Sequence, residues 1–282
     1  MSSLQSAIST GFSDLDAMLG GLHLHELIIL ASRPCMGKTA FATNIADNVA
    51  IEQKKPTVIF SLEMTRGELA LRMMCSRGRV DSHKLRAGYL SPAEYQALAR
   101  ASGELSAAPL YIDDSPDRTV TEIAAVAQRL KQKENIGLIV IDYLGLIKPD
   151  NPADPRQEQV SKIARRLKEL AHELRTPVLC LAQVNRPVQE TKDHRPQLSH
   201  MRESRAIEQL ADVFIFVHRE EYYHSREEAE EMGIRGQAEI IVAKHRNGPV
   251  GTVELAWIGE FTLFSNLAET GLRKCITRLD LS

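Results

Sequence analysis

The sequence has few cysteines, no long apolar run and no marked excess of either charge, and each absence excludes a class of protein. Its four cysteines lie far apart, with no Cys-x-x-Cys pair and no histidine at ligand spacing. That argues against a disulfide scaffold or a zinc module and favours a reducing compartment. No stretch approaches the ~18–20 apolar residues needed to cross a bilayer. The formal net charge is −2, so any nucleic-acid site must be a local basic segment.

The first ten residues lack a basic segment followed by an apolar one, so no signal peptide is expected. Of the 282 residues, 43% are hydrophobic and 26% are charged, close to the globular average. We therefore expect a cytoplasmic protein without membrane contact. The expected organisation is one domain over residues 1–282, with a short N-terminal arm at residues 1–10 and a C-terminal tail at residues 267–282.

Short apolar, β-branched segments alternate with longer segments of helical character. This alternation is typical of an α/β domain with a mostly parallel sheet. Near the C-terminus, Asn247-Gly248 followed by the alternating residues 251–258 predicts an antiparallel hairpin at one sheet edge. The glutamate-rich residues 220–231 are interpreted as a solvated helix face. Strands are expected at residues 26–32, 57–63, 110–113, 136–142, 177–183, 213–217 and 238–243, and helices from residue 38, at 66–77, from 92, at 121–133 and at 157–174.

One segment between a predicted strand and a predicted helix has the pattern of a phosphate-binding loop, with serine replacing glycine at its first position. In such a loop, backbone N–H groups and a helix N-terminus hold phosphate oxygens. Lys38 would reach the β- and γ-phosphates, and the Thr39 hydroxyl would bind Mg²⁺. The alternative is an ordinary strand–turn–helix connection that contains Gly-Lys-Thr. The segment comprises Ser32, Arg33, Pro34, Cys35, Met36, Gly37, Lys38 and Thr39.

Polar residues close three other predicted strands. Asp142 suits the second carboxylate on the Mg²⁺ side, although a strand-end aspartate can also simply cap a turn. Glu63 could polarise the water that attacks the γ-phosphate, and Gln183 could report whether that phosphate is present. Because such folds bind ligands at the carboxyl ends of parallel strands, we expect these side chains to gather beside the loop, with ATP and Mg²⁺ as cofactors.

These motifs and several others resemble a known family. After the loop and Ser61–Met64, the chain contains, in this order, Ile141–Leu144, Arg202–Ser204 with Ile207–Gln209, and Lys244–Pro249. Together they look like the C-terminal motor of the replicative DNA helicase DnaB family, whose fold is RecA-like. The resemblance runs from about residue 9 to residue 266, and Lys244–Pro249 is its most family-specific part.

The resemblance implies residue roles in a nucleotide site. It carries Lys38 and Thr39 over as ligands of the nucleotide and of Mg²⁺, and Asp142 as the Walker B aspartate. It carries Glu63 over as the catalytic base and Gln183 as the sensor. A further family arginine near the active site matches Arg72, for which a surface salt bridge is the alternative.

The resemblance also implies partners. It implies a ring homo-hexamer that hydrolyses nucleoside triphosphate and moves along single-stranded DNA, with primase and a helicase loader as further partners. Arg246, with Lys244, carries over as the finger inserted into the neighbouring subunit's site. The family's helical N-terminal domain is expected to be absent from this chain.

For DNA binding, Arg202 and Glu203 match the family loop that follows the DNA backbone. Arg205 stands where the family usually has glycine, and its charge can replace a backbone contact to phosphate. Arg156 is a second candidate. A proline-interrupted basic segment after Gln183 supports binding to a polyanion, with an exposed polar loop as the alternative. Besides Arg202 and Arg205, this segment contains Arg186, Lys192, His194, Arg195 and His200.

The sequence is also compatible with two other functions. A RecA-like recombinase or DNA-repair ATPase would share the phosphate loop and Asp142, but it would not be expected to carry Lys244–Pro249. A docking domain that binds nucleotide and replication proteins without turnover would have no need of Lys38, Glu63 and Arg246 together.

Overall fold

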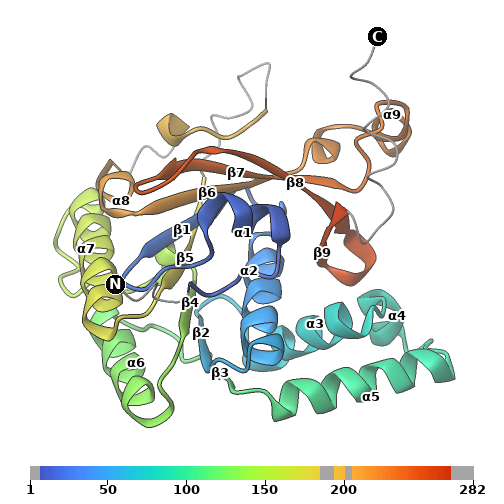
Figure 1. Cartoon of the computed structure of the whole chain (residues 1–282), viewed down its shortest axis with the longest axis horizontal. Coiled ribbons are helices and arrows are strands. Elements are labelled where there is room, and N and C mark those ends of the chain that lie inside the picture. The colour runs from blue at the N-terminus through green and yellow to red at the C-terminus, as the bar shows by residue number, and fades with distance from the viewer. Residues whose placement is uncertain (1–6, 185–193, 201–204, 268–282) are drawn as a thin grey trace, which may run out of the picture.

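The computed structural model describes residues 7–184, 194–200 and 205–267, and it contains one large sheet with helices on both faces (Figure 1). The strand order is β3-β2-β4-β5-β1-β6-β7-β8-β9. Neighbouring strands are parallel from β3 to β6 and antiparallel from β6 to β9. The strands are β1 (Leu27–Ser32), β2 (Thr57–Ser61), β3 (Leu110–Asp113), β4 (Leu138–Asp142), β5 (Val178–Gln183), β6 (Val213–His218), β7 (Gln237–His245), β8 (Gly251–Ile258) and β9 (Leu263–Asn266).

Several helices begin at capping residues that the sequence supplies. At the start of α5, the Ser91 hydroxyl accepts the N–H of Glu94, the Glu94 carboxylate accepts the N–H of Ser91, and Pro92 occupies the first helical position. Thr65, Thr119 and Ser225 form capping boxes of the same kind. The helices are α1 (Ser13–Leu19), α2 (Lys38–Asp47), α3 (Arg66–Gly78), α4 (Ser82–Ala87), α5 (Pro92–Ala107), α6 (Val120–Glu134), α7 (Arg156–Leu174), α8 (Arg205–Leu210) and α9 (Arg226–Glu231).

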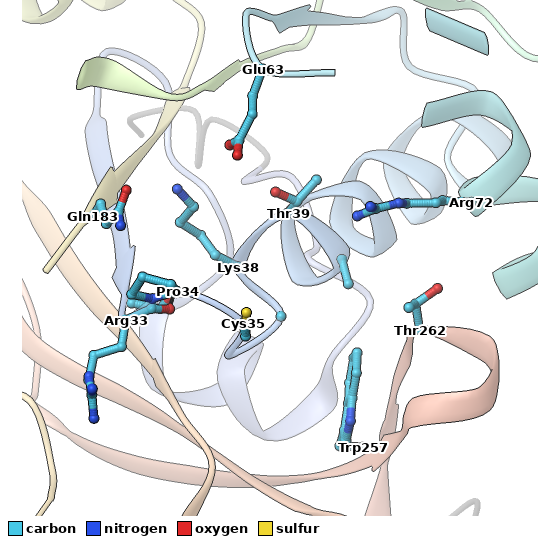
Figure 2. Close-up of a pocket in the computed structure, with 13 residues that line it drawn as sticks. Arg33, Pro34, Cys35, Lys38, Thr39, Glu63, Arg72, Gln183, Trp257 and Thr262 are labelled. Carbon is cyan, nitrogen blue, oxygen red and sulfur yellow. Dashed lines mark hydrogen bonds between the residues drawn. The ribbon is translucent and has the colours of Figure 1, made fainter. Parts of the chain in front are cut away.

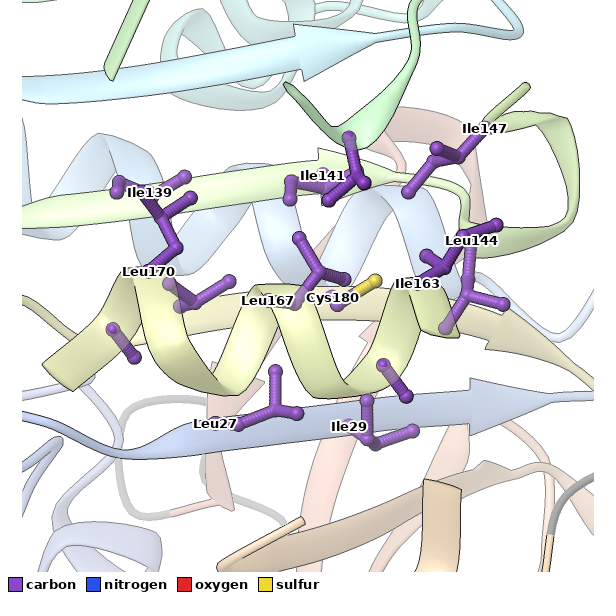
Figure 3. Close-up of a cluster of buried hydrophobic side chains, with 14 of the residues drawn as sticks. Leu27, Ile29, Ile139, Ile141, Leu144, Ile147, Ile163, Leu167, Leu170 and Cys180 are labelled. Carbon is purple, nitrogen blue, oxygen red and sulfur yellow. The ribbon is translucent and has the colours of Figure 1, made fainter. Parts of the chain in front are cut away.

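The core has two parts, one on each face of the sheet, because successive strand residues point to opposite sides. On β1, Leu27 and Ile29 pack with the apolar faces of α6 and α7, whereas Ile28 and Leu30 pack with α1 and α2. Figure 3 shows α7 lying across β1, β5 and β4, with Leu167 directed at the sheet. Burial on both faces explains why the central strands are almost continuously apolar.

This architecture confirms the predicted α/β class, the parallel core and the antiparallel C-terminal strands, with some corrections. The strand β2 stops at Ser61, so Glu63 lies just beyond the strand rather than within it. The strand β9 was not predicted, and it displaces the β7–β8 hairpin from the sheet edge. Residues 220–231 do not form one solvated helix: they divide into a 3₁₀ turn, Glu220–Tyr223, and the short helix α9.

Candidate active site

The loop between β1 and α2 has the predicted strand–loop–helix context. Gly37 precedes α2 in the left-handed conformation, with φ of 93°. A Cβ added there would lie 3.0 Å from the Phe264 ring, so any other residue would be strained by the backbone conformation and would need the ring to shift. The first turn of α2 presents Lys38 and Thr39 at the carboxyl edge of the parallel strands, where the chain directions predicted a ligand site.

Lys38, Thr39 and Asp142 meet at this edge. The Thr39 hydroxyl donates to Asp142 Oδ2 at 2.6 Å, and the Lys38 ammonium lies 3.8 Å from Asp142 Oδ1. Burial lowers the pKa of Lys38, against the opposing attraction of Asp142 and Glu63. Asp142 Oδ1 is buried without a hydrogen-bond partner. An unsatisfied carboxylate oxygen beside a hydroxyl fits Mg²⁺, which prefers oxygen ligands.

The loop borders a cavity of about 390 Å³. Glu63 and Gln183 reach this cavity from the ends of β2 and β5, and Arg72 reaches it from α3 (Figure 2). Gln183 is held beside the loop because β5 pairs with β1, with Gln183 opposite Ser32. The structure therefore brings together the predicted base, sensor, lysine and nearby arginine around one space.

Three further residues line the cavity and were missed by the sequence analysis, and one of them, Ala40, simply follows the loop on α2. Trp257 comes from β8 and Thr262 from the turn before β9 (Figure 2). The Trp257 ring packs against Phe264, with ring centroids 4.7 Å apart, and the guanidinium of Arg219 lies 4.6 Å from the Trp257 ring centroid. The alternation of residues 251–258 predicts an ordinary strand. Nothing in the local sequence indicates that this strand packs beside the phosphate-binding loop.

The remaining side chains of the loop differ in burial and in their hydrogen bonds. Met36 is buried and lies outside the cavity lining, whereas Pro34 and Cys35 line it. Ser32 is buried, and its hydroxyl donates to the Arg33 carbonyl at 2.7 Å. Arg33 donates to the Tyr223 hydroxyl at 2.6 Å.

The 3₁₀ turn that contains Tyr223 is organised around Glu220. The rings of His194, His218 and His224 bond to the Glu220 carboxylate at 3.0–3.1 Å. Burial alone would raise the pKa of Glu220, but these hydrogen bonds outweigh it and lower the pKa to about 2. The sequence pattern missed this environment because one of the three histidines, His194, comes from a distant part of the chain.

Arg246 and Lys244 lie away from the cavity. The antiparallel strand β7 runs toward the opposite edge of the sheet, where His245 pairs with Val213 at the start of β6. Arg246 Nη1 lies 3.3 Å from Asp212 Oδ1. The Lys244 ammonium donates to the carbonyls of Glu208 and Ala211, at 2.6 and 2.7 Å, at the end of α8. Arg246 therefore does not reach this chain's own cavity.

The structure describes only some of the residues that are predicted to bind DNA. Arg202 and Glu203, like Arg186 and Lys192, lie outside the described residues. Arg205 opens α8. Arg156 opens α7 and donates to the Gly145 carbonyl at 3.1 Å. Of the other basic residues, Arg195 forms a two-bond pair with Glu239, at 2.6 and 2.7 Å.

Two features are absent from the described parts of the chain. Within residues 7–184, 194–200 and 205–267, no group of three or more histidine, cysteine, aspartate or glutamate side chains could hold a metal ion. None of the helices in these ranges combines the length and apolar character that a membrane span requires.

Over residues 7–266 the sequence matches the family described as the DnaB-like helicase C-terminal domain. The replicative DNA helicase DnaB of Geobacillus stearothermophilus is 47% identical and the replicative DNA helicase DnaC of Bacillus subtilis is 46% identical, each over 263 residues. Both alignments cover 93% of this chain and 57% of the relative, so the chain spans little more than half of the length of these relatives.

Two solved structures are similar to this fold. One is described as an ATPase domain, and it matches with a TM-score of 0.87 and 36% identity, covering 94% of each chain. A DnaB-like replicative helicase, described with its interactions with primase, matches with a TM-score of 0.87 and 36% identity over 93% of this chain and 62% of that one.

Proposed function

The chain belongs to the family of the DnaB-like helicase C-terminal domain, and we propose that it is the ATP-hydrolysing motor of a replicative DNA helicase. The observation that supports this function most is the contact of Lys38 and Thr39 with Asp142, beside a cavity of about 390 Å³ that Glu63 and Gln183 also line. A nucleoside triphosphate has the charge and the phosphate oxygens that this set of groups would bind.

The residues divide the reaction between them. Lys38 and the N–H groups at the start of α2 bind the β- and γ-phosphates. Glu63 accepts a proton from the water that attacks the γ-phosphorus, while ADP leaves. Thr39 and Asp142 would hold Mg²⁺, which would neutralise phosphate charge when bound. Gln183 senses the γ-phosphate from the end of β5.

Arg246 acts on the nucleotide of an adjacent subunit. Its place at the edge away from its own cavity supports this, because in a head-to-tail ring one subunit's edge faces its neighbour's site. A planar guanidinium there would stabilise the charge on the transferred phosphoryl group. The motor is therefore proposed to be a ring homo-hexamer, with the arginine finger of each subunit completing the next site.

Single-stranded DNA is the proposed track, bound by the segment that contains Arg202, Glu203 and Arg205, with Arg156 as a second contact. The segment begins directly after Gln183, so phosphate sensing and DNA binding would be linked along the chain. Primase is a proposed partner because a similar solved helicase is described with its interactions with primase. A helicase loader follows from the family resemblance.

The test is ATP hydrolysis with and without a single-stranded oligonucleotide, with the mass measured in a non-hydrolysable ATP analogue. We expect DNA to stimulate hydrolysis and the mass to approach six chains of 31.5 kDa. Rings of that mass that bind ATP without turning it over would instead support a docking domain. Strand exchange without unwinding would favour a recombinase.

A further inference from the structure

A charged cluster centred on Asp212 lies at the amino ends of the parallel strands, away from the nucleotide cavity. The Asp212 side chain is only 5% exposed, just before β6. Its Oδ2 accepts the Leu27 N–H at 2.8 Å and the Lys168 ammonium at 2.5 Å. Its Oδ1 faces Arg246 Nη1 at 3.3 Å. One buried carboxylate is thus shared between a lysine of α7 and the arginine that follows β7.

The two cations hold Asp212 with unequal strength. Lys168 is 25% exposed, lies close to Asp212, and also donates to the His25 carbonyl at 2.9 Å. Arg246 is 52% exposed, and its longer contact is weakened by distance and by solvent. Asp212 therefore remains paired with Lys168 and the Leu27 N–H when the guanidinium of Arg246 moves away.

The main chain around Arg246 is held by contacts that do not involve its guanidinium. The Arg246 N–H donates to the Asp212 carbonyl at 2.8 Å, and the Lys244 ammonium binds the Ala211 carbonyl at 2.7 Å. Arg246 lines a second cavity, of about 430 Å³, together with Lys168 and Asp212. There is thus open space into which the side chain can turn while its Cα stays in place.

We propose that Asp212 is a positioning residue for Arg246. It holds the guanidinium at the mouth of this second cavity, directed away from its own chain's nucleotide, and releases it to the triphosphate of the adjacent subunit. Lys168 neutralises Asp212 so that the release leaves no unpaired buried charge. Holding a long side chain near its working geometry reduces the entropy lost on reaching the transition state. The inference rests on the proposed action of Arg246 across a subunit interface.

The test is the variant Asp212→Asn, assayed for ATP hydrolysis in assembled rings. We expect kcat to fall ~10- to 100-fold, the loss typical of a misplaced catalytic group, with KM for ATP unchanged because the variant's own pocket is intact. Mixing with Lys38→Ala subunits should recover activity, because some interfaces then pair an intact pocket with an intact finger. A general folding defect would lower activity without this recovery.

A matched control comes from the same cavity. Glu26 is 6% exposed and lines the second cavity, but among the described residues it forms no hydrogen bond or ion pair with Arg246. Glu26→Gln makes the same carboxyl-to-amide change, and turnover should be unchanged. If Asp212→Asn unfolds, Asp212→Asn/Lys168→Met removes both charges, leaves no unpaired ammonium, and should show the same fall in kcat.

The outcomes separate the two proposals. Wild-type turnover in Asp212→Asn, with turnover lost in Arg246→Ala, overturns the positioning role alone. An equal loss in Glu26→Gln also overturns it, because the effect then belongs to the cavity as a whole. Normal turnover in Arg246→Ala overturns both the finger and its positioning residue.

Discussion

Each end of the parallel strands has a buried aspartate next to a lysine, and the distance between the two charged groups differs between the two ends. At the carboxyl edge, the Lys38 ammonium lies 3.8 Å from Asp142, whose Oδ1 has no hydrogen-bond partner. At the opposite edge, Lys168 lies 2.5 Å from Asp212, and both Asp212 oxygens have partners. Both aspartate side chains are 5% exposed, so burial does not explain the difference.

This difference separates a pair that can bind a ligand from a pair whose groups already satisfy each other. The loose pair retains unused hydrogen-bonding capacity, which a phosphate and a divalent cation would satisfy. The close pair is already satisfied, and only the half-exposed guanidinium of Arg246 is free to exchange partners. The proposed role of Arg246 therefore requires two subunits, because within one chain the sheet separates the two edges.

The largest expected effect comes from Arg246→Ala. Loss of an arginine finger should reduce turnover by ~10³–10⁵-fold, on the order of 4–7 kcal/mol of barrier. ATP should still bind, which the fluorescence of the single tryptophan, Trp257 in the cavity wall, can report. A surface arginine would cost only ~0–1 kcal/mol of stability and no turnover.

Mixing Arg246→Ala with Lys38→Ala subunits tests whether the finger acts across the interface. Some interfaces would then pair an intact Lys38 with an intact Arg246, and partial activity should return. If activity does not return once subunit exchange is demonstrated, Arg246 acts within its own chain. The two strand ends would then not serve different subunits.

The next effect is at the carboxyl edge alone. Glu63→Gln should lower turnover by ~10²–10⁴-fold while retaining nucleotide binding, because the amide cannot accept the water's proton. Lys38→Ala should instead abolish binding, as it removes the charge that holds the phosphates. Titrating nucleotide against Trp257 fluorescence separates the two results, and ordinary hydrolysis by Glu63→Gln would remove its assignment as base.

Local sequence features predicted much of this site. Gly37-Lys38-Thr39 between a strand and a helix located the loop, and residues that close apolar strands had to reach the same edge of a parallel sheet. For Arg246, the family resemblance implied a role in the neighbouring subunit's site, and the structure places it away from this chain's own cavity.

Contacts between distant segments could not be predicted in the same way. Trp257 and Thr262 reach the cavity only because β8 and β9 fold back beside α2, and Asp212 looks like any polar residue before a strand. Glu220 was assigned to solvent because its histidine partners are not all nearby in sequence, as His194 shows. These positions depend on tertiary packing, which hydrophobic periodicity does not encode.

A smaller effect sharpens the contrast between the two pairs. Lys168→Met leaves Asp212 buried with only Arg246 as a charged partner, and should lower the free energy of unfolding by about 1–3 kcal/mol, given partial exposure of the lysine. Lys38→Met should cost much less, because burial lowers the pKa of Lys38 and the folded state holds its charge unfavourably. Urea denaturation compares them, and equal losses would contradict the distinction.

The smallest effect is acid sensitivity at the carboxyl edge. Burial lowers the pKa of His218, the last residue of β6, against hydrogen bonding from Glu220 and the charge of Glu239, with Arg195 lowering it further. An unfolded histidine titrates near pH 6.5, so below that pH the unfolded chain binds the extra proton first. The free energy of unfolding should therefore fall as pH drops below about 6.5.

Glu220 extends this acid sensitivity to lower pH. Its pKa of about 2 adds stability that is present above its ordinary value of 4.5 and is lost as pH falls toward 2. Because its side chain is 32% exposed, this loss should be on the order of 1 kcal/mol after solvent screening. Urea titrations of His218→Gln should flatten the dependence below about pH 6.5, since glutamine keeps a donor for Glu220 but does not titrate. The exposed His83 on α4 supplies the control, His83→Gln, which should keep the wild-type slope. Equal slopes in both variants would show that the buried histidine does not link folding to pH.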